Sequence, residues 1–377
     1  KNHKDNKMND VTKLLSQIDE KRDEVVTDSY TISWREVINL YKENEITISP
    51  DYQRLFRWDN ARQSQFIESL LLNIPTPTLF FYIDNNGKQE VIDGLQRVST
   101  IIRFFSEDIF NKEEIDNAKK QNSVNDVRNP TVLDDVPIIT ELNGWTAKGL
   151  PDKVSRTIKN ARVNVVILEQ ETKPETKYNV FKRLNRSGVR LSDQEIRNCM
   201  ARLAGNEFAD RLRKMAEIDG IVQALGINED GQKSQGVEEA LLRVMASLTY
   251  ADKFSHSVTD FLDEFMFYAA EHNVIDINFE LKIKRTFDLI NIAGLSGKAF
   301  KFRKDGAPSG PFSTNLLDVV AVGIFSNVDN LTPAEVAKRF DYLMDGEIKE
   351  LRACTGSGSN TKAKLEKRIA LGKKVFG

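Results

Sequence analysis

The chain has 377 residues, and its 54 lysines and arginines nearly balance its 56 aspartates and glutamates, giving a formal net charge of −2. This length predicts two domains. The balanced charge excludes a surface that coats nucleic acid without specificity, although it leaves room for one local basic groove.

The two cysteines, Cys199 and Cys354, belong to no pair with metal-ligand spacing, which predicts reduced thiols. No apolar stretch reaches the ~18 residues of a membrane span, and no signal-peptide core follows the charged start. We therefore expect a cytoplasmic protein.

The first third of the chain alternates helix and strand patterns. Residues 1–30 are polar and predict a peripheral helix, because a weak apolar stripe recurs at helical spacing. The stripe consists of Val11, Leu14, Leu15 and Ile18. The next expected elements are a helix from Ser33 with the capping box Ser33–Glu36, a short strand at 46–48, a helix at 60–72, a hairpin of strands 78–83 and 88–92, and a helix that continues to Phe105.

The rest of the chain is mostly helical by its pattern. Residues 106–160 resemble an insertion, and they precede a strand at 163–168, a helix at 174–184 and a capping box at Ser192–Glu195. Beyond about residue 205 the periodicity predicts helices and no strand, with a further capping box at Thr332–Glu335, a loop at 355–359 and a lysine-rich final helix. The predicted parts are an N-terminal helical extension (1–30), an α+β domain (31–205) and an all-helical domain (206–377).

The run Asp93-Gly94-Leu95-Gln96-Arg97 lies where a predicted strand meets a helix. The amides and the positive dipole end of a helix start attract phosphate, and Gly94 permits positive φ or close approach. Arg97 could hold phosphate oxygens bidentately, and Asp93 could hold a metal-bound water. The alternative is structural: Asp93 and Gln96 fit a capping-box variant, with Arg97 solvated on the helix.

A second cluster, Ser49 to Arg54 with Arg57 and Trp58, combines aromatic and guanidinium groups. Tyr52 and Trp58 could stack on a base while Arg54 and Arg57 meet phosphates. Alternatively, Trp58 and Phe56 anchor the core and the arginines are surface residues.

A third cluster runs from Asn185 to Arg190, with Lys182 and Arg183 before it and Arg197 and Asn198 after it. A polar, glycine-containing loop before a capped helix could bind an anion or simply turn the chain.

Four ordered motifs resemble the DUF 262 family over roughly residues 30–205. The motifs are Ile48-x-Pro50-x-Tyr52-Gln53-Arg54-x-x-x-Trp58, then Phe66 to Leu71 with Ile74-Pro75-x-Pro77, then Asp93 to Arg97, then Asn185-x-x-Gly188-x-x-Leu191-x-x-x-Glu195-x-Arg197-Asn198. That family belongs to the ParB/sulfiredoxin-like superfamily and forms the nucleotide-handling half of GmrSD-type restriction and phage-defence proteins. The resemblance implies an α+β fold, a ParB/sulfiredoxin-like N-terminal domain followed by an all-helical C-terminal domain.

The resemblance also implies the roles of particular residues. It implies catalytic roles for Asp93, Gln96 and Arg97, and a nucleotide-binding pocket formed by Gly94, Tyr52, Gln53, Arg54, Asn185 and Arg190. One departure is Leu95, where the family usually has Gln. The loss of this polar side chain weakens the expectation of hydrolysis more than the expectation of binding. The His-Asn-His nuclease motif of many GmrSD-type proteins is absent, because the three histidines (His3, His256 and His272) lie in no such arrangement. We expect no metal site built from protein ligands alone.

Three hypotheses follow, in order of preference. The first is a nucleotide-binding protein of a restriction or antiphage defence type, which takes a nucleoside triphosphate with or without Mg²⁺ and hydrolysis, and which acts with a separate nuclease subunit. The second is a non-catalytic module that binds DNA or senses its modification. Its basic residues would be Arg54, Arg57, Lys182, Arg183, Lys362, Lys364, Lys367 and Arg368. The third is a metal-dependent DNase in which Asp93 and either Glu68 or Glu195 bind the metal.

Overall fold

A computed structural model describes most of the chain and divides it into two compact units, residues 1–190 (unit 1) and 191–377 (unit 2). The described residues are 11, 13–20, 22, 26–48, 56–84, 86–121, 126–169, 172, 174–184, 192–203, 207–233, 235–254, 257–272, 274–355, 358 and 360–377. The division falls before the predicted boundary at residue 205, so helix α10 (Asp193–Leu203) is part of unit 2.

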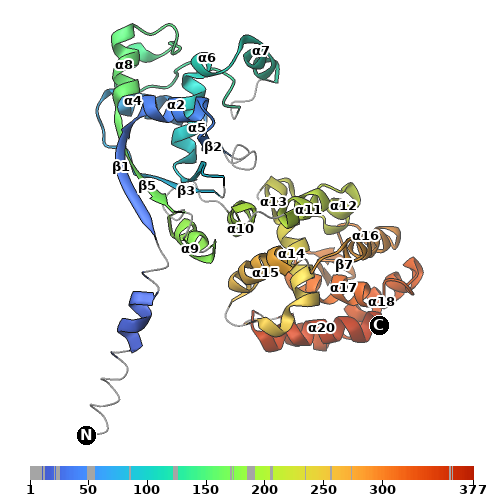
Figure 1. The fold of residues 1–377 in the computed structure, drawn as a ribbon. Helices are drawn as coiled ribbons and strands as arrows, with labels where there is room; N and C mark the ends of the chain where they lie inside the picture. The colour runs from blue at the N-terminus through green and yellow to red at the C-terminus, as the bar shows by residue number, and fades with distance from the viewer. Residues whose placement is uncertain are drawn as a thin grey trace. The chain divides into compact units, whose positions relative to one another are not determined.

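Unit 1 is built on a five-stranded mixed sheet (Figure 1). Its strands are β1 (Thr27–Ser33), β2 (Ile46–Thr47), β3 (Leu79–Ile83), β4 (Gln89–Asp93) and β5 (Arg162–Leu168), in the order β1-β5-β3-β4-β2. The predicted hairpin is confirmed, because β3 and β4 pair antiparallel. Strand β2 pairs parallel with β4, and β3 pairs parallel with β5. Strand β2 ends at Thr47, opposite Glu90, while β4 continues to Asp93.

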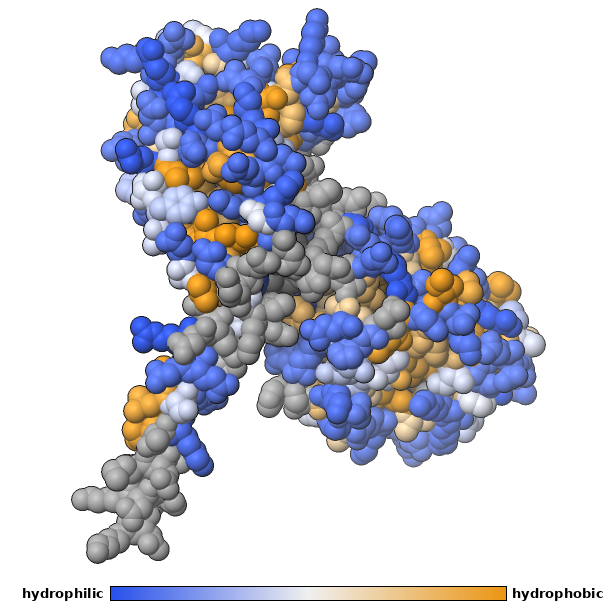
Figure 2. Space-filling view, viewed as in Figure 1, coloured by the Kyte–Doolittle hydropathy of each residue, from blue (hydrophilic) through white to orange (hydrophobic). Residues whose placement is uncertain are grey.

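Strand β1 corrects the expectation of helix up to residue 30. Its alternation of threonine and serine with Tyr30 and Ile32 suits a strand, and it pairs antiparallel with β5 from Thr27↔Leu168 to Ser33↔Arg162. The predicted helix is confirmed only for the described residues between 11 and 22, all of which are helical. Its apolar stripe is exposed, since Leu14 and Leu15 are each 55% accessible. Figure 2 shows hydrophobic surface (orange) on this segment.

Helix α5 is the central helix of unit 1, with nearly every residue buried. The helices of this unit are α2 (Trp34–Lys42), α4 (Asn60–Leu71), α5 (Leu95–Phe104), α6 (Ser106–Ile109), α7 (Lys112–Gln121), α8 (Asp152–Asn160) and α9 (Pro174–Leu184). Figure 1 shows α2, α4, α5 and α8 grouped together, with α9 apart from them. Trp34 and Trp58 both contact the ring of Phe66 edge-on, at centroid distances of 5.7 and 5.8 Å. These contacts join α2 to α4, and α5 packs against both of these helices.

Unit 2 is a helical domain with one small hairpin. Its elements are α10, α11 (Glu207–Ala216), α12 (Asp219–Leu225), α13 (Glu229–Lys233), α14 (Gly236–Thr249), α15 (Val258–His272), α16 (Ile277–Ile292), β6 (Phe302–Lys304), β7 (Ala307–Ser309), α17 (Thr314–Ser326), α18 (Pro333–Asp345), α19 (Ile348–Thr355) and α20 (Lys362–Phe376). The hairpin β6–β7 contradicts the expectation of no strand after residue 205; its strands have three residues each, too short for a periodicity signal. Helices α17 and α20 cross closely where Gly323 and Gly372 meet, because a Cβ on either glycine would overlap the opposite backbone.

Both predicted capping boxes are present in unit 2. Ser192 and Glu195 exchange side-chain-to-amide hydrogen bonds of 2.7 and 3.2 Å at the start of α10. Thr332 and Glu335 do the same at the start of α18. Among the described residues, every helix is too short or too polar to cross a bilayer.

Candidate functional site

The turn between β4 and α5 has the geometry that the sequence predicts. Gly94 is in the left-handed region, with φ of 102°, at the N-cap of α5. A Cβ at this position would overlap the side chain of Leu79 and approach the Arg97 guanidinium at 3.3 Å. Any other residue would be strained at this φ and would displace the side chain of Leu79. The first amides of α5 lack partners within the helix, as at any helix start, and suit an anion.

Arg97 points inward from the first turn of α5 and is 8% exposed. Its Nη1 donates to the carbonyl oxygen of Pro77, both Nη atoms lie 3.4 Å from the carbonyl oxygen of Thr78, and Nη2 lies 3.2 Å from Asp93 Oδ2. The alternative of a solvated helix residue is therefore wrong. The contacts indicate that the guanidinium joins the segment before β3 to the turn after β4.

Asp93 lies at the end of β4, and its side chain is 33% exposed. Burial raises the pKa of its carboxyl, while Arg97 and the Gly94 amide lower it. Burial likewise lowers the pKa of Arg97, and Asp93 opposes that shift. A carboxylate with a perturbed pKa beside a helix start is typical of functional sites. Its exposed edge could orient a cation that is bound mainly by phosphate.

Gln96 connects the same turn to the segment that follows residue 55. Its Oε1 accepts from the amides of Arg57 and Trp58 at 2.9 and 3.0 Å. Arg57 is exposed, whereas Phe56 is fully buried and Trp58 contacts Phe66. The core-anchor alternative is thus confirmed for Phe56, whereas Trp58 is half-buried. Gln96 acts here as a positioning residue that brings the backbone of Arg57 to the start of α5.

Replacing Gln96 with methionine should loosen this connection. The amides of Arg57 and Trp58 would lose their acceptor, at a cost of about 1–3 kcal/mol if they stay away from water. We expect hydrogen–deuterium exchange at residues 56–58 to become about tenfold faster. The matched control is Gln65→Met on α4, whose Nε2 bonds only the carbonyl of Asp135. Equal exchange in both variants would contradict the role of Gln96.

Several residues of the predicted pocket lie outside the described part of the chain. These are Tyr52, Gln53, Arg54, Asn185 and Arg190. The structure does describe the residues on either side of Tyr52, Gln53 and Arg54. Ile48 follows β2, which pairs with β4, and Phe56 precedes the amides held by Gln96. Ile48 therefore leaves the sheet next to β4, and the amides of Arg57 and Trp58 lie at the start of α5.

The third cluster is divided between the two units. Arg197 and Asn198 lie on α10 and are buried in unit 2. Arg197 pairs with Asp263 at 2.6 Å and Glu239 at 3.1 Å. Asn198 donates to Gln235 at 2.8 Å. These two residues hold α10 against its own unit.

The candidate metal ligands have structural partners. Glu68 is 3% exposed, and its Oε1 accepts from the amides of Ile138 and Ile139 at 2.8 and 2.6 Å. Glu195 belongs to the capping box of α10 in unit 2. Within the described ranges, no three histidine, cysteine or carboxylate side chains are grouped as metal ligands. The structure therefore gives no support for the DNase hypothesis with these ligands.

The basic C-terminal helix α20 is largely committed to contacts within unit 2. Arg368 is 1% exposed and pairs with Asp318, which removes it from any DNA-binding surface. Lys362 and Lys364 donate to the carbonyls of Asp252 and Ala353. The expectation of a basic DNA-binding surface that includes Arg368 is wrong.

A glycine turn from a strand into a buried helix, on a mixed sheet, defines unit 1 as an α+β domain with a candidate anion site. The family model described as GmrSD restriction endonuclease, N-terminal domain, matches residues 36–201, which is less than half of the chain. The resemblance to the DUF 262 family is confirmed. Neither a curated protein nor a solved structure matches the chain, so the ParB-like fold remains a prediction. The family indicates a protein of a restriction or antiphage defence type.

Proposed function

We propose that unit 1 binds a nucleoside triphosphate at the turn after β4, with the phosphates on the first amides of α5, and that binding controls a restriction activity supplied by a separate nuclease subunit. The proposal depends most on the hydrogen bond that Gln96 Oε1 accepts from the Arg57 amide. This bond places the backbone of Arg57 at the Gly94 turn, where a ligand can approach the backbone closely. Arg57 is exposed and could contact the phosphates. Arg97 supports the site indirectly, because its guanidinium nitrogens already hold the carbonyls of residues 77 and 78.

The residues present fit a phosphate-bound Mg²⁺ better than a dedicated metal site. Mg²⁺ in nucleotide sites usually keeps several waters and takes one or two carboxylates besides the phosphates. Asp93 supplies one partly exposed carboxylate at the turn. In this proposal Asp93 orients the hydrated cation, and Leu95, which is 8% exposed, closes the inner side of the turn against water.

Isothermal titration of the full chain with each of the four common nucleoside triphosphates, with and without Mg²⁺, tests the proposal. We expect Arg57→Ala to weaken binding about tenfold, as for loss of one charge-assisted hydrogen bond. Arg62→Ala, on the exposed side of α4, is the matched control and should bind like the parent chain. Asp93→Asn should weaken binding in Mg²⁺ while leaving metal-free binding unchanged.

Two outcomes would overturn the assignment. One is that no triphosphate binds at millimolar concentration. The other is that Arg57→Ala and Arg62→Ala lose affinity equally, which would place the ligand elsewhere. Phosphate release that requires Mg²⁺ and disappears in Asp93→Asn would extend the proposal from binding to hydrolysis.

A further inference from the structure

Unit 2 contains a cavity of about 400 Å³ that is lined by residues from four separate segments. Gly226 and Asn228 come from the loop after α12, Gly236 begins α14, and Thr314 begins α17. Phe312 lies in the loop before α17. The volume is in the range of small-molecule binding sites.

Two helix starts lie at the wall of this cavity. Helix α14 has 14 residues and begins at Gly236; helix α17 has 13 residues and begins at Thr314. Each helix start carries about half a positive charge, although at α17 the Leu316 amide already donates to Ser313 Oγ at 3.4 Å. Two such ends at one cavity favour an anion more strongly than either end alone. A ligand would still require a side chain that is directed at it.

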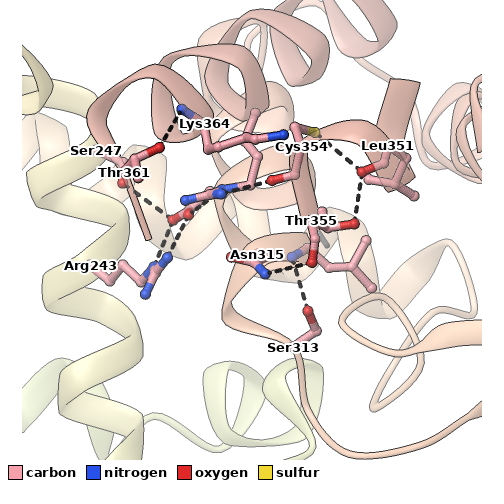
Figure 3. Close-up of polar contacts among 12 residues, drawn as sticks. Arg243, Ser247, Ser313, Asn315, Leu351, Cys354, Thr355, Thr361 and Lys364 are labelled. Carbon is pink, nitrogen blue, oxygen red and sulfur yellow. Dashed lines mark hydrogen bonds and ion pairs between the residues drawn. The ribbon is translucent and has the colours of Figure 1, made fainter. Parts of the chain in front are cut away.

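Arg243 supplies that side chain. It is 6% exposed and lines the cavity. Its Nε and Nη2 bond the two oxygens of Asp318 at 2.8 and 2.7 Å (dashed lines at Arg243 in Figure 3). Among the described residues, no acceptor is found for Nη1. This nitrogen is not among the fully buried atoms without a partner, so it keeps some solvent access and can donate to an anion in the cavity.

The local charge balance is positive. Asp318 is fully buried and is shared by two arginines, since Arg368 Nε also lies 2.9 Å from its Oδ2. Lys301 is half-buried at the cavity wall, and the described part of the chain offers it no anionic partner. Glu239, the acidic residue of the lining, is paired with Arg197 at 3.1 Å. Arg197 also pairs with Asp263, so the four cations of this region (Arg197, Arg243, Arg368 and Lys301) exceed its three carboxylates (Asp263, Asp318 and Glu239) by one charge.

We propose that this cavity binds a phosphate monoester of mononucleotide size, a second ligand site that is separate from the one proposed for unit 1. The phosphate contacts Arg243 Nη1 and Lys301 and lies near the positive ends of α14 and α17. The half-buried ring of Phe312 packs against the base or sugar. A defence protein with this site senses a small phosphorylated ligand through its helical unit.

The test is calorimetric titration of the full chain with inorganic phosphate, a nucleoside monophosphate and the matching nucleoside. We expect the monophosphate to bind more tightly than inorganic phosphate, and the nucleoside to bind at least tenfold more weakly than the monophosphate. Lys301→Ala should weaken binding about tenfold, whereas Lys301→Arg should retain it. Lys298→Ala, three residues earlier, is the control, because Lys298 is exposed and outside the cavity lining.

The outcomes separate this proposal from the one for unit 1. Arg57→Ala should leave monophosphate binding unchanged if the ligand lies in unit 2. No saturable binding of either phosphate compound up to about 10 mM, or equal losses in Lys301→Ala and Lys298→Ala, would overturn the proposal. Binding of inorganic phosphate and monophosphate with equal affinity would contradict the contribution of Phe312.

Discussion

Replacing Asp318 with alanine should lower the free energy of unfolding of unit 2 by about 3–5 kcal/mol. Asp318 is fully buried and accepts from Arg243, from Arg368 and, at 3.3 Å, from Ser247. Its removal would leave two guanidinium groups in the interior of unit 2 without a carboxylate. The measurement is urea denaturation of the full chain, followed by far-UV circular dichroism, which reports the helices of both units.

Tryptophan fluorescence provides an internal reference for this experiment. The three tryptophans, Trp34, Trp58 and Trp145, all lie in unit 1. The fluorescence transition should therefore stay in place in Asp318→Ala while the circular dichroism transition moves to lower urea. The control is Asp341→Ala, because Asp341 is 60% exposed in its pair with Arg303 and should contribute less than about 1 kcal/mol. Equal effects of the two substitutions would show that the buried cluster does not stabilise unit 2.

Local signals account for the parts of the fold that the sequence predicts correctly. Strand β4, Gly94 and helix α5 are consecutive, so the turn follows from residue types within a dozen positions. The capping box at Ser192–Glu195 likewise depends on residues three apart. Strand β1 could not be recognised this way, because its hydrogen-bonding partner β5 follows more than a hundred residues later. Its pairing, rather than its own pattern, decides that it is a strand.

The same distinction explains why the buried arginines could not be recognised from the sequence. Arg97 is 20 residues from Pro77 along the chain, and Arg243 and Arg368 are 75 and 50 residues from Asp318. Arg103 is 3% exposed and bonds Asn129 and Gln63, and burial lowers its pKa to about 10. An arginine in a sequence is most often a surface or phosphate-binding residue. In this protein several arginines hold distant segments together, so the predicted phosphate-binding role of Arg97 has to be separated from its structural one.

Arg97→Ala should reduce the stability of unit 1 by about 3 kcal/mol. The substitution removes the donors that hold the carbonyls of Pro77 and Thr78, and it leaves the partly buried Asp93 carboxylate without its cation. The stability of Arg97→Lys should lie between that of the parent chain and that of Arg97→Ala. A lysine keeps the charge but cannot reach both carbonyls and Asp93 together. Tryptophan fluorescence during urea denaturation measures the effect in unit 1 directly.

A double variant separates the two contributions of Arg97. If the unpaired carboxylate dominates the loss, Asp93→Ala should recover part of the stability in the Arg97→Ala background. If the carbonyl contacts dominate, the double variant should be no more stable than Arg97→Ala. Arg62→Ala is the control for loss of an exposed arginine and should shift the transition by less than about 0.5 kcal/mol. An Arg97→Ala curve that overlays this control would show that the guanidinium is not needed to hold the turn. In that case its inward position would be a resting state, and the side chain would be available to a phosphate after all.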